Sequence, residues 1–410
     1  MKINIKRLMA DIEKYAIYGS QPGKGVTRPS FSEPDYQVRE LFIKELETMG
    51  VAVHIDPIAN IWGTLKGNGK NEKAIVIGSH LDTVPNGGKY DGALGVLAAK
   101  EVLQTLLDHQ KELNHPVQIV SFTAEESNEF NFSTMGSRTI TGKLKTEELA
   151  NARSQEGVNL SDAVRKAGGN ITALPETPEI PMKVFFELHI EQGKKLEKQN
   201  LPVGVVDKIV GIYREIVTVV GEQNHSGTTM MDERRDALAA AGEMVASVQK
   251  ITKNLHTDTV ATVGKFEIYP NAANIIPGRA EFILEVRSAD KTEREKLIAD
   301  IHQSFNTIKE FHGVELSYKK IYDIQECEFD YELVEILKSS AEQAEVPYMV
   351  MPSMAGHDAM HIAGQAKAAM LFVKSIGGIS HNPAEFSKLE DIEQCVNVLL
   401  NAIIMADEKL

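Results

Sequence analysis

Cysteine is scarce in this chain: Cys327 and Cys395 are the two among 410 residues. Two cysteines can build neither a disulfide framework nor a zinc site of the cysteine type. Long apolar runs are also missing, since no uncharged stretch approaches the ~18 residues that a membrane span needs. Residues 1–7 contain two lysines and an arginine instead of the apolar core of a signal peptide. We therefore expect a soluble cytoplasmic protein without a membrane segment.

Basic residues are outnumbered: Lys and Arg total 44, Asp and Glu total 58, and the formal net charge is −14. Such a chain is not expected to bind nucleic acid or to anchor to a membrane through a polybasic segment. It can still hold a local basic pocket for a small anionic substrate. The hydrophobic fraction of 42% and the charged fraction of 25% are those of a globular protein, and the length suffices for two or three domains.

Short β-rich runs alternate with helical patterns in the first half of the chain. The apolar runs 74–78 and 117–122 are typical of strands buried on both faces, and residues 92–107 between them repeat small apolar side chains at helical spacing. This alternation predicts an α/β fold with a mainly parallel central sheet.

The pattern changes near residue 211. From there the expected order is strand, helix, strand, strand, helix, strand, which is typical of a ferredoxin-like α+β unit; the ranges are 216–220, 235–250, 260–268, 280–287, 291–311 and 314–321. After about residue 325 the earlier alternation resumes. We therefore predict a discontinuous domain of residues 1–210 and 326–410, into which a smaller domain, residues 211–325, is inserted.

Side chains that can bind metal follow or adjoin several predicted strands: His80, Asp91, Glu126 (next to Glu125), His189 and His381. Each is ambiguous alone, because Asp91 would serve equally as a helix N-cap and a strand-end histidine can be a core residue. Open α/β sheets place ligands at the carboxyl ends of their strands, so we expect the five at one edge. Three imidazoles and two carboxylates suit zinc or a similar divalent ion, and they suffice for two ions if one carboxylate bridges.

The remaining histidines carry weaker signals. Six lie among polar or charged residues and are expected to be solvated: His54, His109, His115, His256, His302 and His312. His361 follows His357 by four residues on a possible helix and is expected to be structural.

Seven stretches spread over nearly the whole chain carry a resemblance to a known family: 78–84 (GSHLDTV), 87–92 (GGKYDG), 187–193 (ELHIEQG), 224–229 (NHSGTT), 274–278 (NIIPG), 355–359 (AGHDA) and 380–385 (SHNPAE). With them the chain resembles the metal-dependent amidohydrolases of the M20 clan, in particular the hydantoinase/carbamoylase branch. That branch includes N-carbamoyl-L-amino-acid hydrolases, allantoate amidohydrolases and β-ureidopropionases. The set is specific for the branch and much less specific for a substrate within it.

The resemblance implies a metallopeptidase-type catalytic domain with two divalent ions, zinc or else manganese, cobalt or nickel. His80 and His189 would hold one ion and Glu126 and His381 the other, with Asp91 bridging. Asp82 would orient His80, and Glu125 would be the general base. Of two adjacent glutamates, one can face the metals while its neighbour faces the attacking water.

The resemblance also implies that the inserted domain is a lid and dimerisation domain, so that the protein is a homodimer. His225 would stabilise the oxyanion, and Asn274 and Arg287 would hold a substrate carboxylate, which a planar guanidinium matches well. Gln192 and His357 would be further substrate contacts. Without the resemblance, His225 could cap a turn, Asn274 could shape a loop and Arg287 could be an exposed strand residue.

The implied reaction is hydrolysis of the C–N bond of an N-carbamoyl-L-amino acid or a related ureido acid, with attack by metal-bound hydroxide on the carbonyl carbon. An allantoate amidohydrolase is the nearest alternative, followed by an aminoacylase or dipeptidase. An inactive metal-binding protein is a further alternative, against which the retention of Glu125 argues. Five residues depart from the usual pattern of the branch, and two of them, Ser127 and Met354, leave the substrate open; the others are Met230, Glu285 and Lys374.

Overall fold

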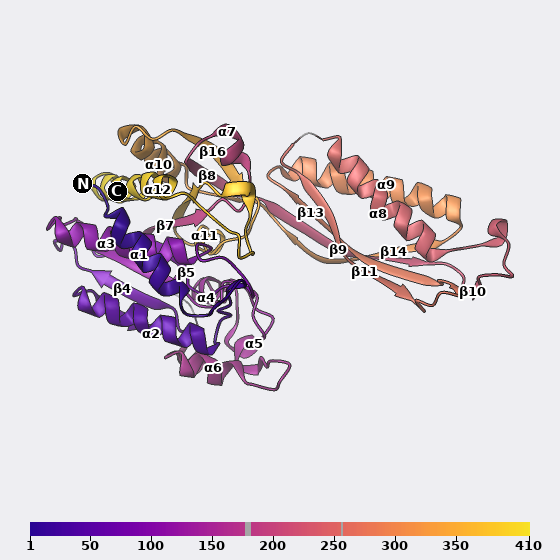
Figure 1. The fold of residues 1–410 in the computed structure, drawn as a ribbon, viewed down its shortest axis with the longest axis horizontal. Helices are drawn as coiled ribbons and strands as arrows, with labels where there is room; N and C mark the ends of the chain where they lie inside the picture. Colours follow the sequence, from indigo (N-terminus) through magenta and orange to yellow (C-terminus); the bar gives the residue numbers. More distant parts are fainter. Residues whose placement is uncertain (177–181, 256) are drawn as a thin grey trace. The chain divides into compact units, whose positions relative to one another are not determined.

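The computed structural model describes residues 1–176, 182–255 and 257–410, and in it the chain forms two compact units (Figure 1). Unit 1 comprises Met1–Asp207 with Glu328–Leu410, and unit 2 comprises Lys208–Cys327. The domain boundaries expected from the sequence, after residues 210 and 325, lie within three residues of these. The two units are described separately below.

Unit 1 is built around a nine-stranded sheet in the order β15-β8-β17-β7-β5-β6-β4-β3, with β16 also paired to β8. The pairs from β17 through β7 and β5 to β6 are parallel, whereas β8, β4 and β3 are antiparallel to their neighbours. This mainly parallel centre confirms the predicted α/β class. The strands are β3 (Ala52–Ile55), β4 (Ile61–Leu65), β5 (Ala74–His80), β6 (Val117–Phe122), β7 (Met182–Ile190), β8 (Val203–Ile209), β15 (Cys327–Glu328), β16 (Tyr348–Ser353) and β17 (Lys367–Val373), and β1 (Ser20–Gln21) and β2 (Gly25–Val26) form a separate hairpin.

Helices cover the parallel strands, and most residues of these strands are apolar. All seven residues of β5 are buried, and full burial of one Val or Ile side chain contributes about 1.5–3 kcal/mol. Helices α3, α10 and α12 contact strands of the parallel centre, and so do α4 and α11. The helices of unit 1 are α1 (Ile5–Ala16), α2 (Glu33–Thr48), α3 (Ala93–Asp108), α4 (Met135–Ile140), α5 (Thr146–Asn151), α6 (Leu160–Lys166), α7 (Lys195–Gln199), α10 (Tyr331–Gln343), α11 (Ala359–Ile362) and α12 (Leu389–Lys409), with 3-10 turns at Ile171–Ala173 and Ile376–Gly378.

The ends of the parallel strands position the predicted ligands. His80 is the last residue of β5, and His189 is the residue before the end of β7. The Glu125–Glu126 pair follows β6, and His381 follows β17. Parallel strands have their carboxyl ends at the same edge of a sheet, so the topology alone brings these side chains together.

Unit 2 has a four-stranded antiparallel sheet in the order β11-β13-β9-β14, against which α8 and α9 pack. Counted along the unit, the strand order is 2-3-1-4, which is the predicted ferredoxin-like arrangement. The sheet strands are β9 (Gly211–Val220), β11 (Val260–Tyr269), β13 (Arg279–Ser288) and β14 (Glu315–Ile324); a short pair, β10 (Asn224–His225) with β12 (Ile275–Ile276), lies outside it, and the helices are α8 (Ala237–Lys253), α9 (Lys291–His312) and a 3-10 turn at Met231–Glu233.

The sequence pattern of unit 2 explains its two layers. Along β13, residues 280, 282, 284 and 286 are buried in one apolar cluster with residues of α8 and α9, and the residues between them are partly exposed. Asp236 caps α8 by accepting two backbone N–H groups, and Gly313 ends α9 in the left-handed conformation that favours glycine. The helices therefore cover one face of the sheet.

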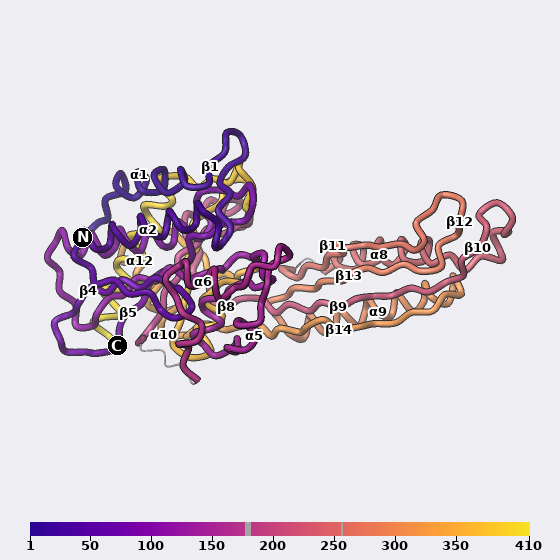
Figure 2. Tube along the Cα trace, turned by 90° about the horizontal axis from the view of Figure 1, so that it is seen from below, coloured from indigo at the N-terminus to yellow at the C-terminus, as the bar shows by residue number. Residues whose placement is uncertain are grey.

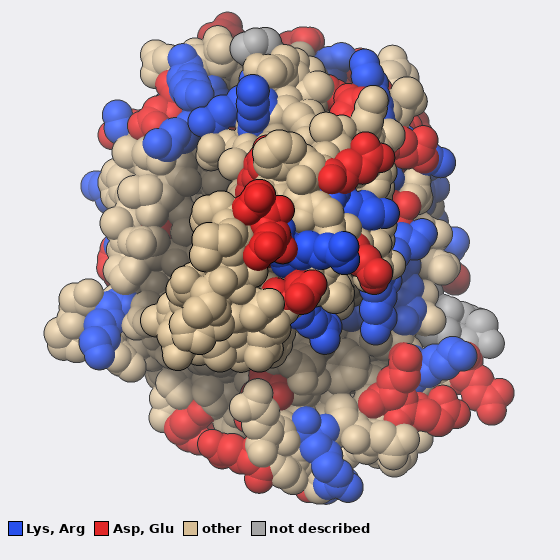
Figure 3. All heavy atoms as spheres, turned by 90° about the vertical axis from the view of Figure 1, so that its right-hand side faces the viewer, with Lys and Arg blue, Asp and Glu red and all other residues tan. Residues whose placement is uncertain are grey.

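The surface carries charges of both signs. Figure 3 shows acidic and basic side chains interspersed over one face of the molecule. Among the residues that the structure describes, no helix combines the length and the hydrophobicity needed to span a membrane.

Candidate metal centre

Two groups of possible metal ligands in unit 1 share one carboxylate. The first consists of His80, Asp91 and His189, and the second of Asp91, Glu126 and His381; within each group the ligand atoms lie within 4.8 Å of one another. Asp91 Oδ1 is 3.6 Å from His80 Nε2 and 3.2 Å from His189 Nε2. Its Oδ2 is 3.4 Å from His381 Nε2, which is itself 3.3 Å from Glu126 Oε1. One oxygen of Asp91 thus faces each group, as a bridging carboxylate requires.

Backbone carbonyls hold the two buried histidines in one tautomer. Nδ1 of His80 lies 3.0 Å from the carbonyl oxygen of Asp82, and Nδ1 of His189 lies 3.0 Å from that of Ile190. A carbonyl only accepts, so each Nδ1 carries the hydrogen. In the neutral imidazole, Nε2 is therefore the nitrogen without a hydrogen, and it is the atom that a metal would bind. In this structure His189 Nε2 accepts the Gly92 N–H at 3.1 Å.

The charges of the site fit two divalent cations. Burial opposes a charged His80, but the carboxylates of Glu125, Asp82 and Asp91 outweigh it and raise its pKa well above 6.5. Burial also opposes ionisation of Asp91, yet the neighbouring imidazoles, first that of His189, hold its pKa well below 3.8. Clustered carboxylates thus draw protons onto their histidines, and divalent cations replace such protons when they bind.

Glu125 lies beside the first ligand group. Its Oε2 is 3.7 Å from His80 Nε2, and its side chain is 12% exposed. Burial raises the pKa of Glu125 well above 4.5; His80 opposes this shift, and the charges of Glu126 and Asp358 add to it. A raised pKa means that this carboxylate takes up a proton more readily than an exposed glutamate does, which suits a general base.

Asp82 contacts both the His80 imidazole, which it was expected to orient, and the backbone of the loop after β6. Its Oδ1 is 3.6 Å from His80 Nδ1. Its carboxylate also accepts the backbone N–H groups of Glu125 and Glu126, at 3.3 and 3.1 Å. Asp82 therefore connects a ligand of the first group with the loop that carries the candidate base and a ligand of the second.

The other two contacts predicted in unit 1 both lie against ligands. Gln192 Nε2 donates to Asp91 Oδ2 at 2.8 Å and to Ser380 Oγ at 3.2 Å. His357 is 2% exposed, and its ring centroid lies 4.5 Å from that of His189. Both side chains support the ligands in this structure, and their contact with a substrate stays a prediction.

Two further residues contact Asp91, and neither was among the site residues predicted from the sequence. Ser380 Oγ donates to Asp91 Oδ2 at 2.9 Å. Glu385 Oε1 accepts the backbone N–H groups of Tyr90 and Asp91, each at 3.0 Å, and so fixes the loop that carries the shared carboxylate. The signal that could have found them is their position in the stretch 380–385, around His381.

The three residues predicted from the inserted domain lie at opposite ends of unit 2. His225 is in β10, and Asn274 directly precedes β12; these two short strands pair beyond the end of β9 at Val220 (Figure 2). Arg287 instead pairs with Ile212, near the start of β9. Eight residue steps separate these two ends, which amounts to about 27 Å. One copy of unit 2 therefore cannot bring His225 and Arg287 to the same small substrate.

Local hydrogen bonds orient both of these side chains. Nδ1 of the exposed His225 accepts the Gly227 N–H at 3.0 Å, so Nε2 carries the hydrogen and is available as a donor. Arg287 Nε donates to Glu285 Oε1 at 2.8 Å, and Arg214 Nε donates to Glu285 Oε2 at 2.9 Å. Glu285 thus holds two guanidinium groups on the face of the sheet away from the helices.

One histidine that was expected to be solvated is buried. His115 is 2% exposed, and its Nδ1 lies 3.0 Å from Asp407 Oδ1. The prediction for His115 is wrong because polar sequence neighbours do not reveal that α12 covers the ring. His54 and His109 are exposed, His302 and His312 are partly exposed, and His256 lies outside the described residues.

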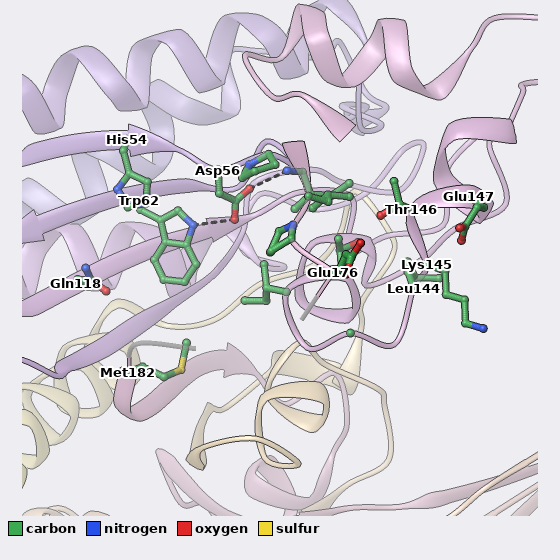
Figure 4. Close-up of a pocket in the computed structure, with 17 residues that line it drawn as sticks. His54, Asp56, Trp62, Gln118, Leu144, Lys145, Thr146, Glu147, Glu176 and Met182 are labelled. Carbon is green, nitrogen blue, oxygen red and sulfur yellow. Dashed lines mark hydrogen bonds between the residues drawn. The ribbon is translucent and has the colours of Figure 1, made fainter. Parts of the chain in front are cut away.

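A pocket of about 670 Å³ in unit 1 is lined by none of the predicted site residues. In it, His54 stacks on Trp62, and Trp62 Nε1 donates to Asp56 Oδ2 at 3.0 Å (Figure 4). Part of its wall, residues 174–176 and Met182, adjoins residues 177–181, which lie outside the described part of the chain. This pocket is therefore distinct from the site that the two ligand groups form.

The chain is similar to known proteins over nearly its whole length. Residues 76–405 match peptidase family M20/M25/M40. The chain is 35% identical over 400 residues to the N-carbamoyl-L-amino acid amidohydrolase of Geobacillus stearothermophilus, with 97% of each protein covered. It is 34% identical over 404 residues to the allantoate amidohydrolase of Bacillus subtilis, with 98% of each covered. A crystal structure of an amidase of the hydantoinase/carbamoylase family from Burkholderia multivorans superposes with a TM-score of 0.91, at 32% identity and 98% coverage of both chains.

The chain belongs to peptidase family M20/M25/M40. It is a hydrolase that acts on C–N bonds, and the resemblance to the hydantoinase/carbamoylase branch is confirmed.

Proposed function

We propose that the protein hydrolyses the C–N bond of N-carbamoyl-L-amino acids or closely related ureido acids, with two divalent ions at its ligand groups. The observation that carries this proposal is the pair of groups sharing Asp91, with Glu125 beside the first of them. The relatives named for carbamoyl amino acids and for allantoate support a ureido substrate. Hydrolysis of a carbamoyl amino acid would yield the amino acid, ammonia and carbon dioxide.

The proposed ligands are His80 and His189 for one ion and Glu126 and His381 for the other, with Asp91 between them. When bound, two divalent ions lower the pKa of water and polarise a carbonyl group. The native metal is proposed to be zinc, manganese, cobalt or nickel, because imidazole and carboxylate ligands accept all four.

The remaining steps belong to side chains of the protein. Glu125 takes the proton of the water that attacks the carbonyl carbon and delivers it to the departing nitrogen. His225 donates from Nε2 to the oxyanion. Arg287 and Asn274 hold the carboxylate of the substrate, and Gln192 and His357 are further contacts.

Allantoate is the second candidate substrate, since relatives from two bacteria are named allantoate amidohydrolase. Ammonia release from N-carbamoyl-L-amino acids and from allantoate, and release of the free amino acid from N-acetyl amino acids, each measured with Mn²⁺, distinguish the candidates. Turnover of an acetyl amino acid in preference to every ureido compound would overturn the proposal.

The role of Glu125 is tested by Glu125→Gln. A general base contributes about 10²- to 10⁴-fold, so kcat is expected to fall by at least a hundredfold. The affinity for Mn²⁺ should stay within threefold, because Glu125 is not a proposed ligand. Glu129→Gln, at an exposed carboxylate of the same loop, is the matched control and should keep wild-type activity. If wild type and Glu125→Gln both bind the metal and are equally inactive, Glu125 is not a general base.

A further inference from the structure

An N-terminal segment, residues 26–31, runs along the loop that follows β5, and we call it the active-site strap. Val26 and Gly87 exchange two backbone hydrogen bonds, of 3.0 and 2.8 Å. Farther along, the backbone of Arg28 receives one hydrogen bond from Thr83 N–H and donates another to Thr83 Oγ1, both at 2.9 Å. The strap therefore keeps a fixed register against the loop that begins at His80.

Arg28 anchors the strap from within the protein. Its side chain is 1% exposed. Nη1 donates to the carbonyl oxygens of Tyr15 and Tyr18, at 2.9 and 2.7 Å, and Nε donates to that of Leu81 at 2.8 Å. A buried guanidinium with three carbonyl partners leaves the strap little freedom to move relative to the loop.

Ser30 is the point at which the strap reaches the catalytic machinery. It is 5% exposed, and its hydroxyl donates to Asp82 Oδ2 at 2.7 Å. The same carboxylate accepts the backbone N–H groups of Glu125 and Glu126 and faces His80 Nδ1. The Ser30 hydroxyl thus binds a carboxylate that connects ligands of both groups with the candidate base.

We propose that Ser30 is a positioning residue: through Asp82 it fixes His80 and the Glu125–Glu126 backbone in the arrangement that binds both metal ions. The proposal rests on the proposed function only for its kinetic consequence. Partners of groups that orient metal ligands are typically worth about 10- to 100-fold in metal affinity or activity. Ser30 contacts Asp82 and does not contact a proposed metal ligand directly. We therefore expect an effect near the lower end of this ~10- to 100-fold range.

The test uses the full chain, freed of metal and titrated with Mn²⁺ by calorimetry, as wild type, Ser30→Ala, Ser30→Thr and Ser32→Ala. Ser32 is the matched control because it is a serine two residues along whose buried hydroxyl has no hydrogen-bond partner among the described residues. Ser30→Thr keeps the hydroxyl. The thermal midpoint of each metal-free variant reports whether the fold is intact, and kcat and KM are measured on the best ureido substrate.

We expect Ser30→Ala to raise the dissociation constant for Mn²⁺ about tenfold and to lower kcat about tenfold, with KM within twofold. Ser30→Thr and Ser32→Ala should remain within twofold of wild type. The proposal would be overturned if Ser30→Ala bound Mn²⁺ as tightly as Ser32→Ala does. It would also be overturned if Ser30→Thr lost as much Mn²⁺ affinity as Ser30→Ala. If the wild type cleaves no ureido compound, the proposed function fails, whereas the Mn²⁺ titrations still decide the role of Ser30.

Discussion

Hydrogen bonds to the ring nitrogens distinguish the histidines of this protein. Nδ1 of His80 and Nδ1 of His189 each face a carbonyl oxygen, which leaves Nε2 for a metal. In His361, Nδ1 lies 3.3 Å from the ammonium of Lys143, and Nε2 lies 2.9 Å from Thr134 Oγ1. An ammonium group only donates, so the ring of His361 is neutral and carries its hydrogen on Nε2.

This environment predicts an acid-sensitive stability. Burial, aided by the charges of Lys143 and Arg138, lowers the pKa of His361 to about 3, whereas an unfolded histidine titrates near pH ~6.5. The pKa is depressed in the folded state, so the stabilisation is complete above the unfolded value and is lost as the pH falls toward 3. We expect this residue to lower the free energy of unfolding by roughly 1–2 kcal/mol between pH 6.5 and pH 5.

Urea unfolding at these two pH values measures the effect. His361→Gln should flatten the slope relative to wild type. Lys143→Met should flatten it partly, because one of the two neighbouring cations is gone. A His361→Gln slope as steep as that of wild type would show that other groups cause the acid sensitivity.

The residues that could be predicted from the sequence are those whose signal is local. His80 and His189 each close an apolar run, so the strand itself reveals them. Ser30 could not be predicted, because its partner, Asp82, lies 52 residues away. No periodicity or neighbouring motif encodes a contact of that separation.

Among the helices, the two long ones of unit 2 were predicted well, and the short ones of unit 1 were not. The helices of 17 and 22 residues in unit 2, and the alternation of β13, gave the ferredoxin-like order. The helices α4, α5 and α6 have six or seven residues each and were not predicted, because fewer than two turns hold too few repeats for a helical period. Strand β9 begins at Gly211, five residues before the expected start at 216.

The entry to α3 requires glycine. Gly92 has a φ of +63°, and a Cβ there would lie 2.2 Å from His80 Cε1. Gly92→Ala is therefore expected to displace the imidazole and to lower kcat/KM by about a hundredfold, since a misplacement of ~1 Å can cost that much. Its affinity for Mn²⁺ should fall as well. Activity within threefold of wild type would mean that the loop before α3 adapts.

Gly242 lies inside α8, and we expect its replacement by alanine to be favourable, in contrast to that of Gly92. A Cβ at this position meets nothing within 4 Å, and glycine in a helix interior costs about 0.5–1 kcal/mol relative to alanine. Gly242→Ala should therefore stabilise unit 2 by about that amount, with wild-type kinetics. Chemical denaturation followed by circular dichroism measures the change, and a loss of stability would contradict the open surroundings of Gly242.

At the scale of the whole molecule, the register of unit 2 bears on assembly. The proposed roles of His225 and Arg287 require both side chains at one substrate, yet they lie at opposite ends of unit 2. Arg287 pairs with Ile212, close to residue 208 at which the chain enters unit 2 from unit 1. We therefore expect a homodimer in which one chain supplies Glu125 and Arg287 and the other supplies His225 to the same reaction.

Co-expression of differently tagged Glu125→Gln and His225→Ala chains tests this expectation. Each homodimer should be nearly inactive. In the mixed dimer, one of the two sites would combine an intact Glu125 with an intact His225, so about half of the wild-type activity should return. Mixed dimers as inactive as either parent would place both residues of one site on a single chain.

The discontinuity of unit 1 has a consequence for biosynthesis. Strand β17 lies inside the sheet, between β7 and β8, although its residues, 367–373, come late in the sequence. Until residues 367–373 have been synthesised, the nascent chain has no strand to pair with this edge of β7. It also lacks the proposed ligand His381. Unit 2, by contrast, is one continuous segment whose sheet is complete at residue 324. We expect the insert to form during translation and the ion-binding unit to close only as the last part of the polypeptide emerges.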